Sequence, residues 1–295
     1  MSQYRRLLLI IHLALSHSPA INHAAALARA SGARLHIAAL VPPLKLLSLL
    51  EDGDRKKARE RYLQDHRDWL KDQEKLLRGR GIDVTTEVAW TDDMRQDILD
   101  YVAELQPDLL IKEIQHESAL KRALFTPLDW RLLRQCPVPV YLVGGTGHAL
   151  PRMVVAAVDA SAGESEHSEL NDRIIQQASS LAIQCNAELH LLYAHDLSED
   201  YLQELSDSLK LSALSKGGRK ELEKSFLAFA SQYGVPADRR HFVLGHPVTA
   251  LSEFASEHHV DVIVMGRTQY QDLEHPLGST TEHILYQVPC SVLAV

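Results

Sequence analysis

Glycine, hydroxyl, acidic and basic residues in the second half of the chain stand where they could hold a phosphorylated ligand. The residues concerned are Asp159-Ala160, Gly266-Arg267 and Gly278-Ser279-Thr280. Glycines let the backbone approach phosphate oxygens closely, and successive N–H groups form an anion-binding concavity. A helix beginning after Gly278 would add the positive end of its dipole, and the two hydroxyls would add donors. The pattern predicts phosphate binding, and no general base can be assigned beside it.

The elements that would position these residues alternate between strand and helix. Arg152–Val158 and Asp261–Met265 are continuous apolar runs, typical of parallel strands buried on both faces. Helical stretches at Leu170–Cys185 and Val248–His258 separate such runs. This alternation predicts an α/β fold, with a parallel sheet, right-handed crossovers and helices on both faces. Ligands of open α/β sheets bind beyond the carboxyl ends of the strands, where Asp159 is expected.

The first half repeats the same order of elements. Corresponding segments are Arg6–Ile11 and Arg152–Val158, Arg34–Val41 and Glu188–His195, and Gln135–Val143 and Gln287–Val295. The last pair aligns without gaps, and each member begins with Gln and has Pro at its third place. The repetition predicts two domains, at residues 1–143 and 151–295, each with about five strands. Residues 144–150 would form the linker.

The second half resembles the universal stress protein family along its whole length. That family has an Asp at the end of its first strand, as in V-D-x-S, and a loop of the form G-x2-G-x9-G-[ST] after its fourth strand. Val158-Asp159-Ala160-Ser161 and the segment from Gly266 to Thr280 carry the likeness. The resemblance implies a Rossmann-like fold of the adenine nucleotide alpha hydrolase type. It also implies ATP or AMP as the ligand, with Asp159 contacting the nucleoside.

The loop departs from the family pattern in two ways. Gln269 stands where the second glycine is expected, and the interval between the two remaining glycines is one residue shorter. Asp272 and Glu274 would repel phosphates unless they turned outward, whereas Arg267 could reach a phosphate as a charge-assisted donor. The sequence therefore leaves open both nucleotide binding by the second half and a folded copy without nucleotide.

The first half has lost more of the pattern. His12 stands in place of the Asp, Pro127 falls at the position of Ser279 and has no N–H to donate, and no glycine closely follows Lys112. We therefore expect no phosphate binding by the first half. The segment Phe125–Pro137 resembles the tandem subfamily called universal stress protein E, which is degenerate at the same place.

Single-domain relatives in this family dimerise through the last strand. The resemblance therefore implies that Val138–Val143 and Cys290–Val295 pair as an internal pseudo-dimer, and a homodimer of the whole chain is a further expectation. Joining the two halves in one chain would raise their effective concentration.

Three classes of function follow from these patterns. The first is a stress-response regulatory or signalling module that binds adenine nucleotide in the second domain, with at most slow ATP hydrolysis and no assigned catalytic residue. The alternative is a non-catalytic scaffold that binds a protein or an apolar metabolite. The third is a metal-assisted hydrolase that uses some of the 16 histidines. None of these has the H-E-x-x-H or i,i+4 spacing of a dedicated site, so whether a metal is bound stays open.

Composition excludes several other classes. The net charge is −8, with 21 Lys and Arg against 19 Asp and Glu in residues 1–147, and 10 against 20 in the rest. An acidic chain without a basic stripe is a poor candidate for nucleic-acid binding. No apolar stretch near the start approaches the ~20 residues of a membrane helix. The three cysteines form no CxxC pair, which fits a cytoplasmic protein.

Overall fold

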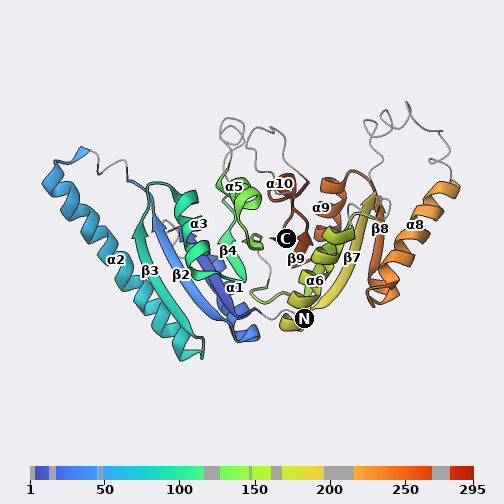
Figure 1. Ribbon diagram of the computed structural model, residues 1–295, viewed down its shortest axis with the longest axis horizontal. Coiled ribbons are helices and arrows are strands. Elements are labelled where there is room, and N and C mark those ends of the chain that lie inside the picture. Colours follow the sequence, from blue (N-terminus) through green and yellow to red (C-terminus); the bar gives the residue numbers. More distant parts are fainter. Residues whose placement is uncertain are drawn as a thin grey trace. The chain divides into compact units, whose positions relative to one another are not determined.

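The computed structural model describes residues 4–12, 18–44, 47, 49–115, 127–145, 148–160, 168–195, 216–267 and 280–295 (Figure 1). The chain divides into two compact units, Ser2–Val143 and Gly144–Val295, which we call the N-unit and the C-unit. Each unit contains five strands and the helices that connect them.

The N-unit is a five-stranded parallel sheet with helices between its strands. Its elements are β1 (Arg6–His12), α1 (Pro19–Ser31), β2 (Arg34–Val41), α2 (Asp52–Gly79), β3 (Val84–Trp90), α3 (Met94–Leu105), β4 (Leu109–Glu113), α5 (Leu128–Gln135) and β5 (Val140–Val143). The strand order is β3-β2-β1-β4-β5. The chain therefore adds β2 and β3 on one side of β1 and then crosses back to add β4 and β5 on the other side.

The C-unit repeats this topology. Its elements are β6 (Met153–Ala157), α6 (Ser168–Cys185), β7 (Glu188–His195), α8 (Lys216–Ser231), β8 (Arg240–Leu244), α9 (Pro247–Glu257), β9 (Val262–Met265), α10 (Thr280–Ile284) and β10 (Ser291–Ala294). Within this unit the strand order is β8-β7-β6-β9-β10, and all pairs are parallel. The α/β fold class predicted from alternation is therefore confirmed in both units.

Helices cover both faces of each sheet. In the N-unit, α3 covers the face that carries His36, whose ring lies 6.1 Å from that of Tyr101. On the opposite face, Thr86 of β3 donates a hydrogen bond to Glu74 of α2 at 2.6 Å, and α2 runs alongside β3 (Figure 1). Side chains alternate between the faces along a strand, so residues of even number on β2 face α3.

The helices form where an apolar stripe can be buried. Only Leu63, Leu70 and Leu77 are buried along the 28 residues of α2, and their seven-residue spacing marks one narrow stripe. The basic cluster at residues 55–61 lies in this helix and is largely exposed, as a solvated face would be. In α1 the hydroxyl of Ser18 caps the first turn by accepting the Ala20 N–H at 3.3 Å.

The described helices contain none that is long and apolar enough to cross a membrane. The three cysteines are buried and free. Burial raises the pKa of Cys185 and of Cys290 to about 12, so both thiols stay protonated at neutral pH.

Candidate functional site

The ends of β6 and β9 bring two predicted site residues to the same edge of the C-unit sheet. These strands pair in parallel, with Ala157 opposite Met265. Asp159 follows the first by two residues and Gly266 follows the second by one. Both therefore lie at the carboxyl edge of the sheet, where open α/β folds bind their ligands.

The backbone of Asp159 is fixed by the side chain of Asn171 in α6. The Asp159 N–H donates to Asn171 Oδ1 at 3.0 Å, and Asn171 Nδ2 donates to the Asp159 carbonyl at 2.7 Å. Asn171 is only 4% exposed, so this two-way bond is sheltered from water. Asp159 itself is exposed and Ala160 half-buried, so the carboxylate sits at the surface on a rigid backbone.

Gly266 is tied to the start of α10. The hydroxyl of Thr281, which is 2% exposed, donates to the Gly266 carbonyl at 2.6 Å. A Cβ at Gly266 would lie 2.7 Å from Cδ2 of Leu170 in α6, so this position accepts a side chain only if Leu170 moves. Thr280 is the exposed first residue of α10. Gly278 and Ser279 lie outside the described residues.

Arg267 is a buried residue at the end of β9. Its side chain is 6% exposed, and its backbone N–H donates to the carbonyl of Val295 at 3.0 Å. The guanidinium is therefore packed into the protein at the end of β9. Direct contact between this side chain and a phosphate stays a prediction from the sequence.

The corresponding edge of the N-unit holds a buried ion pair. Lys112 and Asp129 are 3% and 1% exposed, and their Nζ and Oδ1 atoms lie 2.8 Å apart. Lys112 Nζ also donates to the carbonyl of Glu113 at 2.8 Å, and Asp129 Oδ2 accepts the N–H of Gln115 at 3.0 Å. These bonds compensate much of the cost of burying two charges.

The gapless alignment of the closing segments places Asp129 opposite Thr281. The two side chains have similar structural roles, since each connects the start of a helix to the end of the fourth strand of its unit. In the C-unit the tie is a neutral hydroxyl, and in the N-unit it is a carboxylate already satisfied by Lys112. An anionic carboxylate at this position disfavours a phosphate.

A second bond connects β4 to the start of α1 in the N-unit. Glu113, at the position of Gly266, accepts a hydrogen bond from the hydroxyl of Ser18 at 2.5 Å. A side chain thus lies where the C-unit has bare backbone. The side chain of His12, which stands in place of Asp159, lies outside the described part of the chain.

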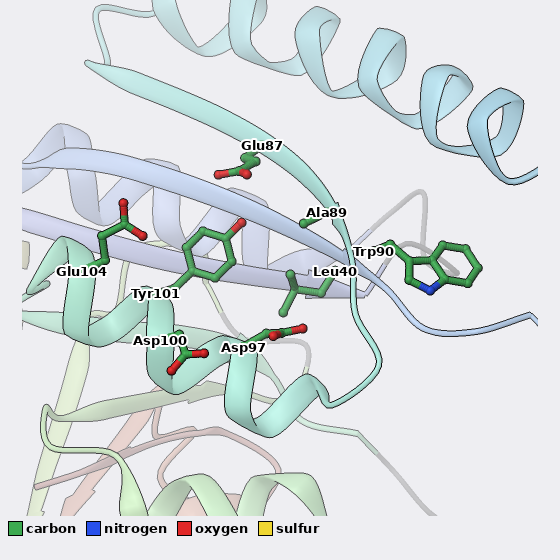
Figure 2. Close-up of a pocket in the computed structure, with 8 residues that line it drawn as sticks. All are labelled: Leu40, Glu87, Ala89, Trp90, Asp97, Asp100, Tyr101 and Glu104. Atoms are coloured by element: carbon green, nitrogen blue, oxygen red, sulfur yellow. The ribbon is translucent and has the colours of Figure 1, made fainter. Parts of the chain in front are cut away.

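A cavity elsewhere in the N-unit has the wrong charge for a nucleotide. It encloses about 280 Å³ between β3 and α3, and its lining includes Glu87, Asp97, Asp100 and Glu104. Figure 2 shows Glu87 of β3 beside the hydroxyl of Tyr101, which projects from α3. Burial raises the pKa of Tyr101, and the neighbouring carboxylate of Glu87 raises it further. Four carboxylates would repel a phosphate.

Two histidines on neighbouring strands of the C-unit contact each other through their rings. His190 Nδ1 lies 2.9 Å from His241 Nε2, with the two rings stacked at 12°. Burial, with the neighbouring rings of His190 and His258, lowers the pKa of His241 to about 4. Among the residues that the structure describes, no group of three or more His, Cys, Asp or Glu could hold a metal ion.

Comparison with known proteins agrees with the fold and the duplication. The model of the universal stress protein family matches residues 3–144 and again residues 152–295. The chain belongs to the universal stress protein family. Two matches, one in each unit, account for nearly the whole sequence and make the protein a tandem member.

One named relative matches the whole chain, and another matches about half of it. Universal stress protein E of Photorhabdus laumondii is 28% identical over 309 aligned residues, which cover 100% of this chain and 96% of the relative. Universal stress protein A homolog 1 of Coxiella burnetii is 28% identical over 143 residues, covering 48% of this chain and 94% of that protein. The resemblance to the universal stress protein E subfamily is thus confirmed, and the shorter relative matches about half of the duplicated chain.

A solved structure shares the fold over the full chain. The crystal structure of a functionally unknown protein from Pseudomonas aeruginosa PAO1 superposes with a TM-score of 0.72 at 26% identity. The match covers 99% of this chain and 92% of that one.

Sequence reasoning missed three residues that shape the two sites. Asn171 carried a faint signal, because it is a polar residue on the buried stripe of an amphipathic helix. Thr281 adjoins the predicted Thr280 and differs from it in pointing inward. Asp129 gave no readable signal, because its partner Lys112 is distant in sequence and only the fold brings them together.

Proposed function

We propose that the protein is a stress-response module that binds an adenine nucleotide, ATP or AMP, at the carboxyl edge of the C-unit sheet. A role in the stress response follows from membership of the universal stress protein family. The observation that carries the nucleotide proposal is the meeting of Asp159 and Gly266 at one edge, through the pairing of β6 with β9. The proposed ligand contacts are Asp159, Ala160, Gly266, Arg267, Gly278, Ser279 and Thr280.

The backbone is held in place at both Asp159 and Gly266, and this supports the assignment. Asn171 holds Asp159 by two hydrogen bonds, and Thr281 holds Gly266 by one. A site whose groups are fixed in advance loses less entropy on binding. The carboxylate of Asp159 would accept hydrogen bonds from ribose hydroxyls, and the missing side chain of Gly266 would let the phosphates approach the backbone.

The N-unit is proposed to bind no nucleotide. Lys112 and Asp129 satisfy each other, and Glu113 bonds to Ser18, so the groups at this edge already have partners within the protein. A phosphate would have to displace an internal carboxylate from the only ammonium described at this edge.

Titration of the purified full-length protein with labelled ATP and AMP tests the proposal. We expect one nucleotide per chain, and a loss of at least tenfold in affinity for Asp159→Ala and for Gly278→Val. The matched control is His12→Ala, at the equivalent position of the N-unit, which should bind as the unmodified protein does. Circular dichroism of each variant checks that the fold is retained.

Two results would refute the assignment. One is saturable binding that survives Asp159→Ala combined with Gly278→Val, and the other is no binding by the unmodified protein. The second result would favour the alternative of a scaffold without nucleotide. Mass spectrometry of protein purified without added ligand separates these cases, since co-purified adenine nucleotide supports the proposal and an empty or lipid-filled site supports the alternative.

A further inference from the structure

A second cavity in the N-unit lies at the opposite end of the strands from the carboxyl edge. It encloses about 230 Å³ and is lined by residues at the beginnings of β1 and β2, by the start of β3 and by the end of α3. Apolar groups dominate its wall, including Leu8, Leu105 and Pro107. A dry apolar cavity of ~150 Å³ is large enough to hold a benzene ring, so this one accommodates a small ring with a polar substituent.

The lining carries a positive excess. It includes two arginines, Arg6 and Arg34, and one acidic residue, Asp83. Arg34 Nε pairs with Asp83 Oδ2 at 3.1 Å. The side chain of Arg6 makes no ion pair within the described residues, and Oδ2 of the nearby Asp108 accepts the backbone N–H groups of Arg5 and Arg6 at 2.7 and 2.8 Å. One cation is therefore available to a ligand.

One of the lining residues, His36, carries a buried polar atom. His36 Nδ1 is 2.8 Å from the hydroxyl of Thr85, and both residues line the cavity. Nε2 of the same ring is buried and has no hydrogen-bond partner among the described residues. Buried polar atoms in folded proteins are nearly always satisfied by protein, water or ligand, so this atom requires a partner of another kind.

The sheet face that α3 covers is acidic at its other end, and this charge difference determines where an anionic ligand can bind. Beyond His36, the rings of Tyr101 and His36 lie 6.1 Å apart, and past them is the acidic cavity lined by Glu87 and Glu104 (Figure 2). An anion is repelled by that end and attracted by the arginine end. The two cavities therefore differ in the charge that they accept.

We propose that the 230 Å³ cavity binds a small carboxylate with an apolar body about the size of one aromatic ring. The apolar body lies against Leu8, Leu105 and Pro107, and the carboxylate pairs with Arg6 at the mouth. This site lies at the amino ends of the strands and needs no nucleotide, so it stands or falls independently of the proposed nucleotide site.

The C-unit offers a matched comparison at the equivalent place. Its strand β7 has Glu188 where β2 has Arg34, and the histidine equivalent to His36 is His190. The ring of His190 is stacked against His241, which is itself 4.7 Å from the ring of Phe254. These rings fill the space beside the second histidine, and a carboxylate stands at its rim. We therefore expect no carboxylate site there.

Fluorine NMR with 4-fluorobenzoate as the probe tests the proposal on the full-length protein. We expect saturable binding in the fluorine spectra and, in proton–carbon spectra of the protein, chemical-shift changes at the methyl groups of Leu8 and Leu105. The neutral isostere 4-fluorobenzamide should bind at least fivefold more weakly, because it cannot pair with a guanidinium. Arg6→Gln should weaken benzoate binding at least fivefold, whereas Arg152→Gln, which removes an arginine at the position of the C-unit that corresponds to Arg5, should leave it unchanged.

A second variant separates the cavity from the charge. Thr85 is exposed at its mouth on the edge strand β3, so Thr85→Phe should fold and should block the probe sterically. The proposal is overturned if no saturable binding appears up to about 10 mM probe, because a Kd above that limit corresponds to less than about 3 kcal/mol of binding free energy. It is equally overturned if benzamide binds as tightly as benzoate, or if Arg6→Gln and Arg152→Gln behave alike.

Discussion

The two units share one skeleton but treat the carboxyl edges of their sheets in opposite ways. In the C-unit, Gly266 leaves the backbone bare and Thr281 ties it down with a neutral hydroxyl. In the N-unit, Glu113 and Asp129 stand at those positions and are satisfied by Ser18 and Lys112. The difference teaches that one parallel sheet tolerates different residues at its carboxyl edge, because internal side chains can satisfy the polar groups there.

The ion pair of the N-unit gives the largest expected effect. Lys112→Met leaves the Asp129 carboxylate buried without its cation, and we expect a loss of about 3–5 kcal/mol in the free energy of unfolding. The double variant Lys112→Met/Asp129→Leu should recover most of that loss. Trp69, Trp90 and Trp130 all lie in the N-unit, so denaturation followed by tryptophan fluorescence reports this unit alone.

The control for this experiment is Met265→Leu, at the position in the C-unit that corresponds to Lys112. It should cost less than about 1.5 kcal/mol and leave the tryptophan transition unchanged. A cost below about 1 kcal/mol for Lys112→Met would mean that the ammonium does not stabilise the edge, and the contrast between the two units would lose its physical basis.

The bare backbone of the C-unit gives the next effect. Gly266→Ala places a methyl group 2.7 Å from Leu170 Cδ2, and overpacking of this kind costs about 1–3 kcal/mol. Leu170→Ala in the same chain should relieve the clash, so the two changes should be strongly non-additive. Hydrogen exchange of C-unit peptides provides the measurement. Additive costs would show that Leu170 is not what Gly266 accommodates.

The histidine pair of the C-unit predicts a pH dependence. Burial lowers the pKa of His190 and, with its neighbouring rings, that of His241 to about 4. The unfolded chain therefore binds more protons than the folded one below pH ~6.5, and stability falls as the pH drops from there toward 4. We expect a loss of about 1–2 kcal/mol for His241, less than full burial would give because the ring is partly exposed.

The measurement is hydrogen exchange of C-unit peptides at pH 7.5 and pH 5, corrected for intrinsic rates. His241→Gln should flatten the dependence in the C-unit. Burial also lowers the pKa of His36, so His36→Gln is the corresponding change in the N-unit and should leave the C-unit profile unchanged. An unaltered pH profile in His241→Gln would assign the dependence to other groups.

The smallest expected effect concerns one surface ion pair in each unit. The charges are exchanged between the units, since β2 contributes Arg34 and the corresponding strand β7 contributes Glu188. Arg34 pairs with Asp83 at 3.1 Å in the N-unit, and Arg239 pairs with Glu188 at 2.8 Å in the C-unit. The side chains of the first pair are 80% and 66% exposed, those of the second 31% and 58%. Removing Arg34 should cost less than about 0.5 kcal/mol and removing Arg239 about 0.5–1 kcal/mol. Equal costs would mean that exposure does not govern these pairs.

Much of the skeleton could be predicted from local patterns. The expected bounds of Arg34–Val41 and Glu188–His195 coincide with β2 and β7. Elsewhere the ends differ by one or two residues, as for α6, which begins at Ser168 and not at Leu170. Apolar periodicity and capping residues are local signals, so they survive without knowledge of the tertiary structure.

The candidate sites were less accessible to the sequence. The family resemblance assigned Asp159, Gly266 and Arg267 to one ligand site, but nothing in the sequence indicated that Arg267 is only 6% exposed. The sequence identified Lys112 only as the start of a segment that lacks glycine. Burial and partner identity depend on contacts between distant segments, which no local pattern encodes.

By itself the sequence determined the duplication, the α/β class and the family, because repeated apolar runs and spaced glycines are properties of the chain. Pairing between Val138–Val143 and Cys290–Val295 stays a prediction. Only the tertiary structure decided how each carboxyl edge is satisfied: by Asn171 and Thr281 in one unit, by Lys112 with Asp129 in the other. The reason is physical, since a buried polar group needs a partner and folding alone decides which partner is within reach.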